Sequence, residues 1–199
     1  LIVFGININH QDNLGYTALH IAALESRLEV LHRLVIVGGN PTLTTNTNNT
    51  CVHILVQRPN LEKRDPYRFM SVLILILDKF PQIVNFQNER GETPVHIACL
   101  FHSKESVILL TKFKNADFSI LTNKGNDLLM CSLINPERTY LSTLRYLIGI
   151  PGAKWNLKKA LDFAEKQNLE GAVKELKKAI ENKQSKTFMP KKWREDGMV

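Results

Sequence analysis

The sequence predicts an all-α fold, a solenoid of stacked helix–turn–helix units from which finger loops project. The first observation is a recurring segment: GYTALHIAAL at 15–24 returns as NNTCVHILVQ at 48–57 and as GETPVHIACL at 91–100. Weaker copies follow, GNDLLMCSLI at 125–134 and LKKALDFAEK at 157–166. The second observation is the spacing, because the equivalent apolar positions lie 33, 43, 34 and 32 residues apart, at Leu19, Val52, Val95, Leu129 and Leu161. A period of about 33 residues indicates one supersecondary unit repeated along the chain.

The first complete unit is expected over 10–42, after a partial unit at about 1–9, and contains two helices. Ser26 and Glu29 have the spacing of a capping box, which predicts that the second helix starts at Ser26. Gly38 or Gly39 is expected to end this helix by adopting a positive φ. One buried face is predicted from four apolar residues, Leu28, Leu31, Leu34 and Val35.

The second unit, expected over 43–85, carries extra residues, RPNLEKRDPY at 58–67, between its two helices. Pro59 is predicted to end the first helix and Pro66 to begin the second. Two interpretations of this insertion have equal weight. It is a surface insertion that loop entropy barely penalises, or it is a contact surface of its own.

The remaining units are expected over 86–118, 119–151 and 152–183, the last being a cap with one polar face. Pro94 fits the first position of a helix, and Asn115 is expected to adopt the left-handed conformation in place of glycine. The basic tail at 184–199 has no repeat register. It contains Phe188, Met189 and Trp193, and a disordered end is favoured over a partner-binding segment.

The recurring segments carry a family resemblance. TALHIA at 17–22 and TPVHIA at 93–98 each fill six consecutive positions of a T-P-L-H-x-A core, and GGNPT at 38–42 and KNADF at 114–118 are similar to the loop that follows each helix pair. On these motifs, residues 1 to about 183 resemble the ankyrin-repeat family. The resemblance implies an ankyrin-repeat solenoid that binds proteins. It also implies structural roles for one threonine and one histidine in each of three units: Thr17, His20, Thr50, His53, Thr93 and His96.

Reactive side chains gather at 90–103, where His96, Cys99 and His102 lie within seven residues. When the units are aligned, however, His20, His53 and His96 occupy the same position in successive units. Side chains one unit apart are too distant to share a metal ion. The cysteines have no second pair at zinc-ligand spacing, and no phosphate loop, nucleophile elbow or dinucleotide fingerprint occurs. We therefore expect no catalytic residue, no cofactor and no metal, and hence a protein that is not an enzyme.

Charge and cysteine content limit the partners and the compartment. The net charge is +7, and from Lys154 onward lysine and arginine exceed acidic residues by 12 to 7. A basic end can attract nucleic acid or an anionic membrane, but here acids alternate with the lysines, which favours a solvated helix face. Three widely spaced cysteines predict a reducing, intracellular compartment, the cytoplasm or the nucleus. The chain is expected to be monomeric on its own.

Candidate partner-binding residues are those positions of the finger loops and first helices that the repeat does not require. In chain order they are Gln11, Asn13, Leu14, Tyr16, Leu24, Asn46, Thr47, Asn49, Gln57, Glu89, Arg90, Glu92, Leu100, Phe101, Asn123, Lys124 and Asn126. For Leu24, Leu100 and Phe101, packing against the next helix is an equally weighted alternative.

The favoured functional hypothesis is an adaptor, scaffold or inhibitor that recognises another protein through its concave face. The alternative is a targeting or substrate-recognition region of a larger multidomain enzyme, or of a bacterial or viral effector that acts in the host cytosol. A third and weaker hypothesis is that the basic end binds nucleic acid or anionic lipid, which would make binding strongly dependent on salt.

Overall fold

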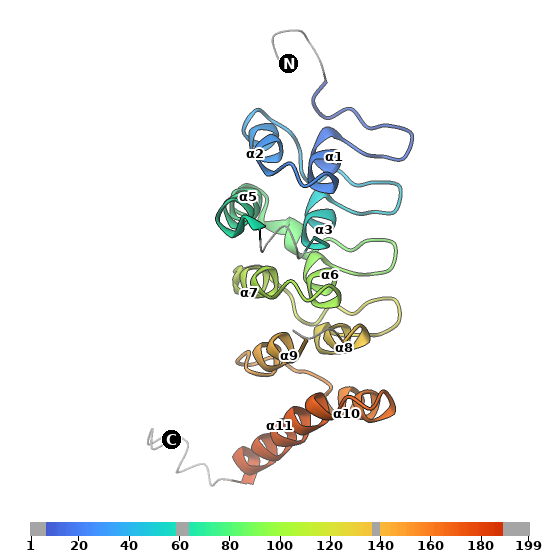
Figure 1. Ribbon diagram of the computed structural model, residues 1–199, viewed down its shortest axis with the longest axis vertical. Helices are drawn as coiled ribbons and strands as arrows, with labels where there is room; N and C mark the ends of the chain where they lie inside the picture. The colour runs from blue at the N-terminus through green and yellow to red at the C-terminus, as the bar shows by residue number, and fades with distance from the viewer. Residues whose placement is uncertain (1–6, 59–63, 137–139, 189–199) are drawn as a thin grey trace.

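The computed structural model describes residues 7–58, 64–136 and 140–188 of the 199-residue chain. In these ranges every regular element is a helix, and the helices stack in pairs along one axis (Figure 1). Five helices form an inner row: α1 (Ala18–Leu24), α3 (Cys51–Val56), α6 (Pro94–Leu100), α8 (Leu128–Ile134) and α10 (Leu157–Lys166). Their outer partners are α2 (Leu28–Ile36), α5 (Pro66–Lys79), α7 (Lys104–Lys112), α9 (Tyr140–Ile148) and α11 (Glu170–Phe188). This is the predicted all-α solenoid of helix–turn–helix units.

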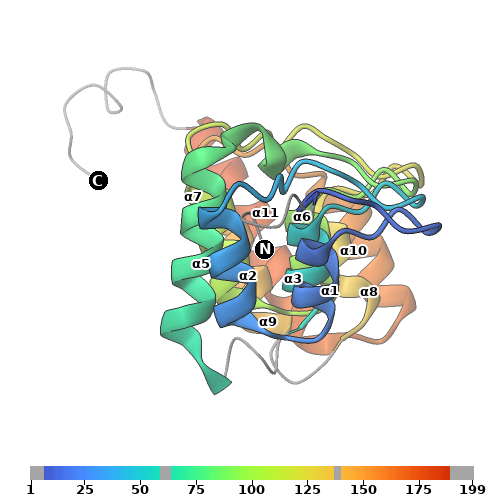
Figure 2. The ribbon, with the colours of Figure 1, turned by 90° about the horizontal axis from the view of Figure 1, so that it is seen from above.

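Seen from above the stack, α2, α5 and α7 lie on one side of the inner row, and the finger loops project on the other (Figure 2). A 3-10 helix, η2 (Pro81–Asn85), connects α5 to the third finger loop. Successive inner helices contact one another along the whole row. None of the helices in the described part of the chain is long and apolar enough to cross a membrane.

A continuous apolar core runs between the two rows. The equivalent inner positions Leu19, Val52, Val95 and Leu129 are all buried. Outer helices contribute side chains such as Leu31, Leu73, Val107 and Leu144, all fully buried. One helix pair is too small to bury its own apolar face, so each unit depends on its neighbours.

Short polar caps start the inner helices. Thr50 is the N-cap of α3, and its hydroxyl accepts a hydrogen bond from the backbone N–H of His53. Asp127 is the N-cap of α8, and its carboxylate accepts from the backbone N–H of Met130 at 2.8 Å. The fourth unit therefore retains a cap although it has lost the Thr-Pro-Leu-His sequence, because aspartate satisfies the same free backbone donors.

The predicted capping box at Ser26 is wrong. Arg27 is the N-cap of α2 and makes no side-chain cap, while Ser26 has a φ of 59°. Ser26 instead ends α1, because the N–H of Arg27 donates to the carbonyl of Ala22 at 2.8 Å across a left-handed residue. His102 and Asn168 occupy the same place in later units, with φ of 53° and 55°. A residue committed to this turn is not available as an extended N-cap.

The ends of the outer helices only partly follow the prediction. Gly38 has a φ of 98° and terminates α2, as expected. Asn115 does not have a positive φ, so that prediction is wrong. The chain leaves α7 at Phe113, whose φ of −65° and ψ of 133° are extended, so no left-handed residue is required. Pro66 begins α5 with Asp65 as its N-cap, while Pro59 lies outside the described residues.

The last helix is longer than the sequence indicated. We expected the chain to be disordered from residue 184, but α11 continues to Phe188. No glycine or proline interrupts the sequence between Gly171 and Pro190, so helix propensity carries the helix past the expected boundary. Met189 and Trp193 lie outside the described residues.

Candidate functional site

Four finger loops, at 11–17, 44–50, 87–93 and 121–127, form a row on one side of the stack (Figures 1 and 2). Each is a tight turn closed by a backbone hydrogen bond. In the third finger the N–H of Asn88 donates to the carbonyl of Glu92 at 2.9 Å, and in the fourth the N–H of Thr122 donates to the carbonyl of Asn126 at 3.0 Å. The turns are thus rigid local structures rather than open loops.

Backbone hydrogen bonds also join each finger loop to the next. The N–H of Asn46 donates to the carbonyl of Leu14, that of Glu89 to Thr47, and that of Asn123 to Arg90, each at 3.0 Å. This close approach requires a residue without a side chain in the third finger. A Cβ atom on Gly91 would lie 2.5 Å from Oδ1 of Asn123 and 2.7 Å from its backbone nitrogen. The four fingers therefore form one connected surface.

Three of the candidate partner-binding residues also make hydrogen bonds that join the fingers. Gln11 donates from its amide to the carbonyls of Gly15 and Thr44, at 2.9 and 2.8 Å. The amide of Asn46 donates to the carbonyl of Asn13 at 3.0 Å. The amide of Asn123 donates in the same way to the carbonyl of Glu89 at 2.8 Å. These side chains fix the position of each finger relative to the next.

Sequence reasoning overlooked Gln87, which repeats the role of Gln11. Its amide donates to the carbonyls of Gly91 and Leu121, at 2.9 and 3.3 Å. A signal was present, because a glutamine stands four residues before the finger glycine in both the first and the third fingers. Asn88 was also overlooked; it links two fingers by donating to Oδ1 of Asn49 at 3.2 Å.

The finger tips present several exposed side chains. Leu14 is 64% exposed, and Asn13 beside it is also exposed. Arg90 is exposed and forms an ion pair within its own finger, with Nε 2.9 Å from Oε2 of the half-buried Glu92. Three further exposed residues complete the row: Thr47, Glu89 and Lys124.

The other candidate residues do not join this row. Leu24, Gln57 and Leu100 lie at or just after the C-terminal ends of the inner helices, opposite the fingers, and are half-buried. Seven residues of helix, about 10 Å, separate Leu24 from its finger. Leu24 and Leu100 pack against the core, as does the half-buried Tyr16, whereas Phe101 is 41% exposed. The two remaining candidates, Asn49 and Asn126, belong to the fingers and are half-buried.

A threonine–histidine pair lies at the base of each of the first three fingers. The N–H of Thr50 donates to Nδ1 of His53 at 3.1 Å, and Nε2 of the same ring lies 3.1 Å from the carbonyl oxygen of Glu92. A carbonyl oxygen only accepts, so Nε2 carries the proton and the neutral ring satisfies both partners. His20 has the same geometry, with Nε2 3.1 Å from the carbonyl oxygen of Asn49.

His96 repeats half of this arrangement. Its Nδ1 lies 2.8 Å from Oγ1 of Thr93, but its Nε2 has no hydrogen-bond partner among the described residues. Burial lowers the pKa of His53 and that of His96 to about 4 each. The rings are therefore neutral at physiological pH, and their role is to hydrogen-bond the backbone and side chains around them.

Two buried cysteines are poorly suited to nucleophilic chemistry. Burial raises the pKa of the Cys51 and Cys131 thiols to about 12, which keeps both protonated. Across residues 7–58, 64–136 and 140–188, no group of three or more His, Cys, Asp and Glu side chains is placed to hold a metal ion.

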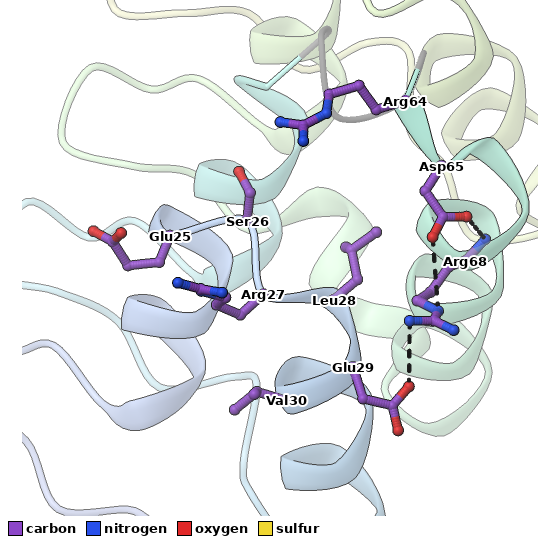
Figure 3. Close-up of a pocket in the computed structure, with 9 residues that line it drawn as sticks. All are labelled: Glu25, Ser26, Arg27, Leu28, Glu29, Val30, Arg64, Asp65 and Arg68. Atoms are coloured by element: carbon purple, nitrogen blue, oxygen red, sulfur yellow. Dashed lines mark hydrogen bonds and ion pairs between the residues drawn. The ribbon is translucent and has the colours of Figure 1, made fainter.

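Hollows border the described stack at several places, and two of them bear on the candidate surface. One, of about 580 Å³, lies between the α1–α2 turn and the start of α5, where Arg68 forms ion pairs with Glu29 at 3.6 Å and Asp65 at 3.7 Å (Figure 3). Arg64 and Asp65 are the part of the insertion that borders it. This hollow is at the turn end of the helices, so the described part of the insertion does not extend the finger row.

The second hollow, of about 610 Å³, lies beside the fourth finger and is lined by Leu121, Lys154 and Lys159 among others. Among the described residues of the fifth unit, no finger loop packs on the fourth. Lys159 takes its place, because its Nζ donates to the carbonyl of Gly125 at 2.6 Å. The row of fingers therefore ends at a side-chain amine, with open space next to it.

Comparison with known proteins adds the following. The sequence matches the family model described as "Ankyrin repeats (many copies)" over residues 1–35. It is similar to the probable 26S proteasome regulatory subunit p28 of Saccharomyces cerevisiae, 28% identical over 149 residues, which cover 60% of this chain and 65% of that protein. It is similar to the target of rapamycin complex 2 subunit AVO2 of the same yeast, 27% identical over 114 residues, 56% of this chain and 24% of that protein. A putative ankyrin repeat protein of Acanthamoeba polyphaga mimivirus is 30% identical over 91 residues, 45% of this chain and 20% of that protein. The chain thus spans less than two thirds of each relative.

Proposed function

Because the chain belongs to the ankyrin-repeat family, we propose that it is a protein–protein interaction module that binds its partner along the row of finger tips. The observation that carries this proposal is the ladder of hydrogen bonds between successive fingers. A surface that is already rigid loses little conformational entropy on binding, which favours affinity. The module would act as an adaptor or an inhibitor, without chemistry of its own.

The chemistry of the tips supports a protein partner. Leu14 offers an apolar anchor at one end of the row, and polar and charged side chains surround it, which is the usual composition of a protein interface. Charges of both signs lie on the tips, with Glu89 acidic and Arg90 and Lys124 basic. A partner with an apolar contact point and mixed charges would complement this row.

Ion pairs near the C-terminal end argue against nucleic acid or an anionic membrane as the partner. A nucleic-acid surface needs a stripe of unopposed basic residues. Near the basic C-terminal end, Arg145 of α9 pairs with Glu175 of α11 at 2.9 Å, and Lys177 pairs with Glu165 at 3.0 Å. These acids reduce the positive potential that the net charge of the chain would otherwise concentrate there.

A second candidate function is recognition on behalf of a larger protein. This chain covers only 24% of AVO2 and 20% of the mimivirus protein, so modules of this type occur within longer chains. In that case the finger row would select the target and another region would act on it, as in a multidomain enzyme or a host-directed effector. An intracellular location suits both candidates, because Cys51, Cys99 and Cys131 are all free and buried.

Site-specific photo-crosslinking tests the proposed surface. A photoreactive amino acid is placed at Leu14 or Lys124 on the finger tips, and at Lys112 on the outer helix α7 as the matched exposed control. We expect both finger positions to capture the same protein in cells, and the control to capture it weakly or not at all. Capture from Lys112 alone, or of unrelated proteins from the two finger positions, would refute binding along the row.

A further inference from the structure

One end of the stack exposes apolar positions that are covered everywhere else. Ile21 of α1 is 45% exposed, whereas its equivalents Ile54, Ile97 and Cys131 are 5%, 0% and 1% exposed. Each equivalent is the fourth residue of its inner helix, and α3, α6 and α8 each pack against the inner helix of the preceding unit. Ala18, the first residue of α1, is also exposed, while the first residues of α3, α6 and α8 are all buried.

The outer helix α2 shows the same difference. Val30 directly precedes the central buried residue Leu31 and is 48% exposed. The residues that precede Leu73, Val107 and Leu144 in the other outer helices are all fully buried: Val72, Ser106 and Thr143. Ala18, Ile21 and Val30 together form what we call the N-terminal end face, and it has the composition of an interface between units.

The segment that precedes α1 makes the same hydrogen bonds as the segment that follows an outer helix later in the stack. Oδ1 of Asn9 accepts from the N–H of Asn40 at 2.7 Å, and its amide donates to the carbonyl of Gly38 at 3.3 Å. Asn85 makes the corresponding pair of bonds, to Asp117 at 3.0 Å and to Asn115 at 2.6 Å. Because Asn85 ends the segment that follows the outer helix α5, Asn9 occupies the place of a residue that follows an outer helix.

The opposite end of the stack is built differently. Every exposed residue between positions 157 and 183, in α10, α11 and their turn, is either charged or an amide. Terminal units of solenoids need such a polar outer face to remain soluble. The α10–α11 end of the described stack is therefore polar, whereas its α1–α2 end is apolar.

We infer that the N-terminal end face binds a further helix pair of the same repeat type, belonging to the same polypeptide and joined ahead of Asn7. Such a unit would place its inner helix against Ala18 and Ile21 and its outer helix against Val30, as α1 and α2 cover α3 and α5. The occupant follows from continuity with the four unit interfaces between the five described helix pairs. This inference does not depend on the proposed function of the finger row.

The test compares the 199-residue chain with the natural polypeptide extended upstream of Leu1 by one repeat, about 33 residues. Thermal unfolding is followed by circular dichroism for each protein and for its Ile21→Arg variant. The matched control is Ile36→Arg, at a position that is 55% exposed and equivalent in place to the exposed Lys112 at the end of α7.

We expect Ile21→Arg to lower the Tm of the extended protein by about 5 °C or more and to leave the Tm of the 199-residue chain nearly unchanged. Ile36→Arg should leave both proteins unchanged. An equal effect of Ile21→Arg in the two proteins, or an upstream sequence that encodes no helix pair, would overturn the inference. So would a dimer of the 199-residue chain that Ile21→Arg dissociates, since the face would then belong to a second copy.

Discussion

Nε2 of His53 lies 3.1 Å from the carbonyl oxygen of Glu92, a residue 39 positions later in the chain and in the next finger loop. Nδ1 of the same ring accepts from the N–H of Thr50, so a single side chain joins the start of α3 to the third finger. Because His20 joins α1 to the second finger in the same way, the stability of the stack and the shape of the finger row depend on the same residues.

Replacement of His53 by alanine should destabilise the protein by about 3 kcal/mol, through lost hydrogen bonds and a cavity in a buried position. Chemical denaturation followed by circular dichroism measures this loss. His10→Ala, at an exposed histidine before the first finger, is the control and should change the free energy of unfolding by less than about 0.5 kcal/mol. Equal effects of the two substitutions would show that the His53 contacts do not contribute.

Stability should fall as the pH is lowered from 7 to 5. Burial lowers the pKa of His53 and His96 to about 4 each, below the ordinary value of 6.5, so the unfolded chain binds protons in this window and the folded chain does not. The stabilisation is complete above pH 6.5 and is lost as the pH falls toward 4. We expect each histidine to contribute about 1–2 kcal/mol to the loss at pH 5.

Urea denaturation at a series of pH values checks this prediction. The same series on His53→Ala should show a smaller loss, since that variant lacks one of the buried rings. An urea midpoint that stays constant between pH 7 and pH 5 would contradict the neutral, buried state assigned to these rings.

Alanine substitutions at two finger glycines distinguish the cost of backbone strain from the cost of steric contact between fingers. Gly91 and Gly125 have similar φ values, 72° and 67°, so alanine at either site costs about 1–2 kcal/mol for the left-handed conformation. Only at Gly91 would the new Cβ also meet the next finger, 2.5 Å from Oδ1 of Asn123, whereas at Gly125 the nearest atom, Nζ of Lys159, is 4.0 Å away. Gly91→Ala should therefore lower the free energy of unfolding by about 1–2 kcal/mol more than Gly125→Ala. Denaturation curves of the two variants decide this, and equal losses would mean that the fingers separate without cost.

The sequence predicted the architecture well because one register repeats along it. Once Leu19, Val52 and Val95 were aligned, the helix pairs, their apolar faces and the finger positions followed. Ser26 was assigned to the wrong helix end because a serine followed by a glutamate matches a start signal, and only the backbone shows a positive φ there. The left-handed conformation predicted for Asn115 was wrong because the backbone is already extended at Phe113, so no left-handed residue is needed to end α7.

The candidate binding residues were harder to predict, because a position that the repeat does not require is not always free. Asn46 and Asn123 vary from the consensus, yet their amides bind the backbone of the preceding finger. Contacts of this kind depend on the distance between fingers, which no single unit of sequence encodes. Leu14 and Lys124, in contrast, are exposed in the structure as well as variable in the repeat, and they remain the proposed contacts.

The most direct test of the account is the affinity of the protein that is crosslinked from the finger tips, measured by isothermal titration calorimetry. The triple variant Leu14→Asp, Arg90→Ala, Lys124→Ala should weaken the Kd at least tenfold, about 1.4 kcal/mol or more, with unchanged helical content. The exposed pair Lys112→Ala, Lys174→Ala, on α7 and α11, should bind as tightly as the unmodified chain. An unchanged Kd for the triple variant would contradict the claim that the finger row is the binding surface.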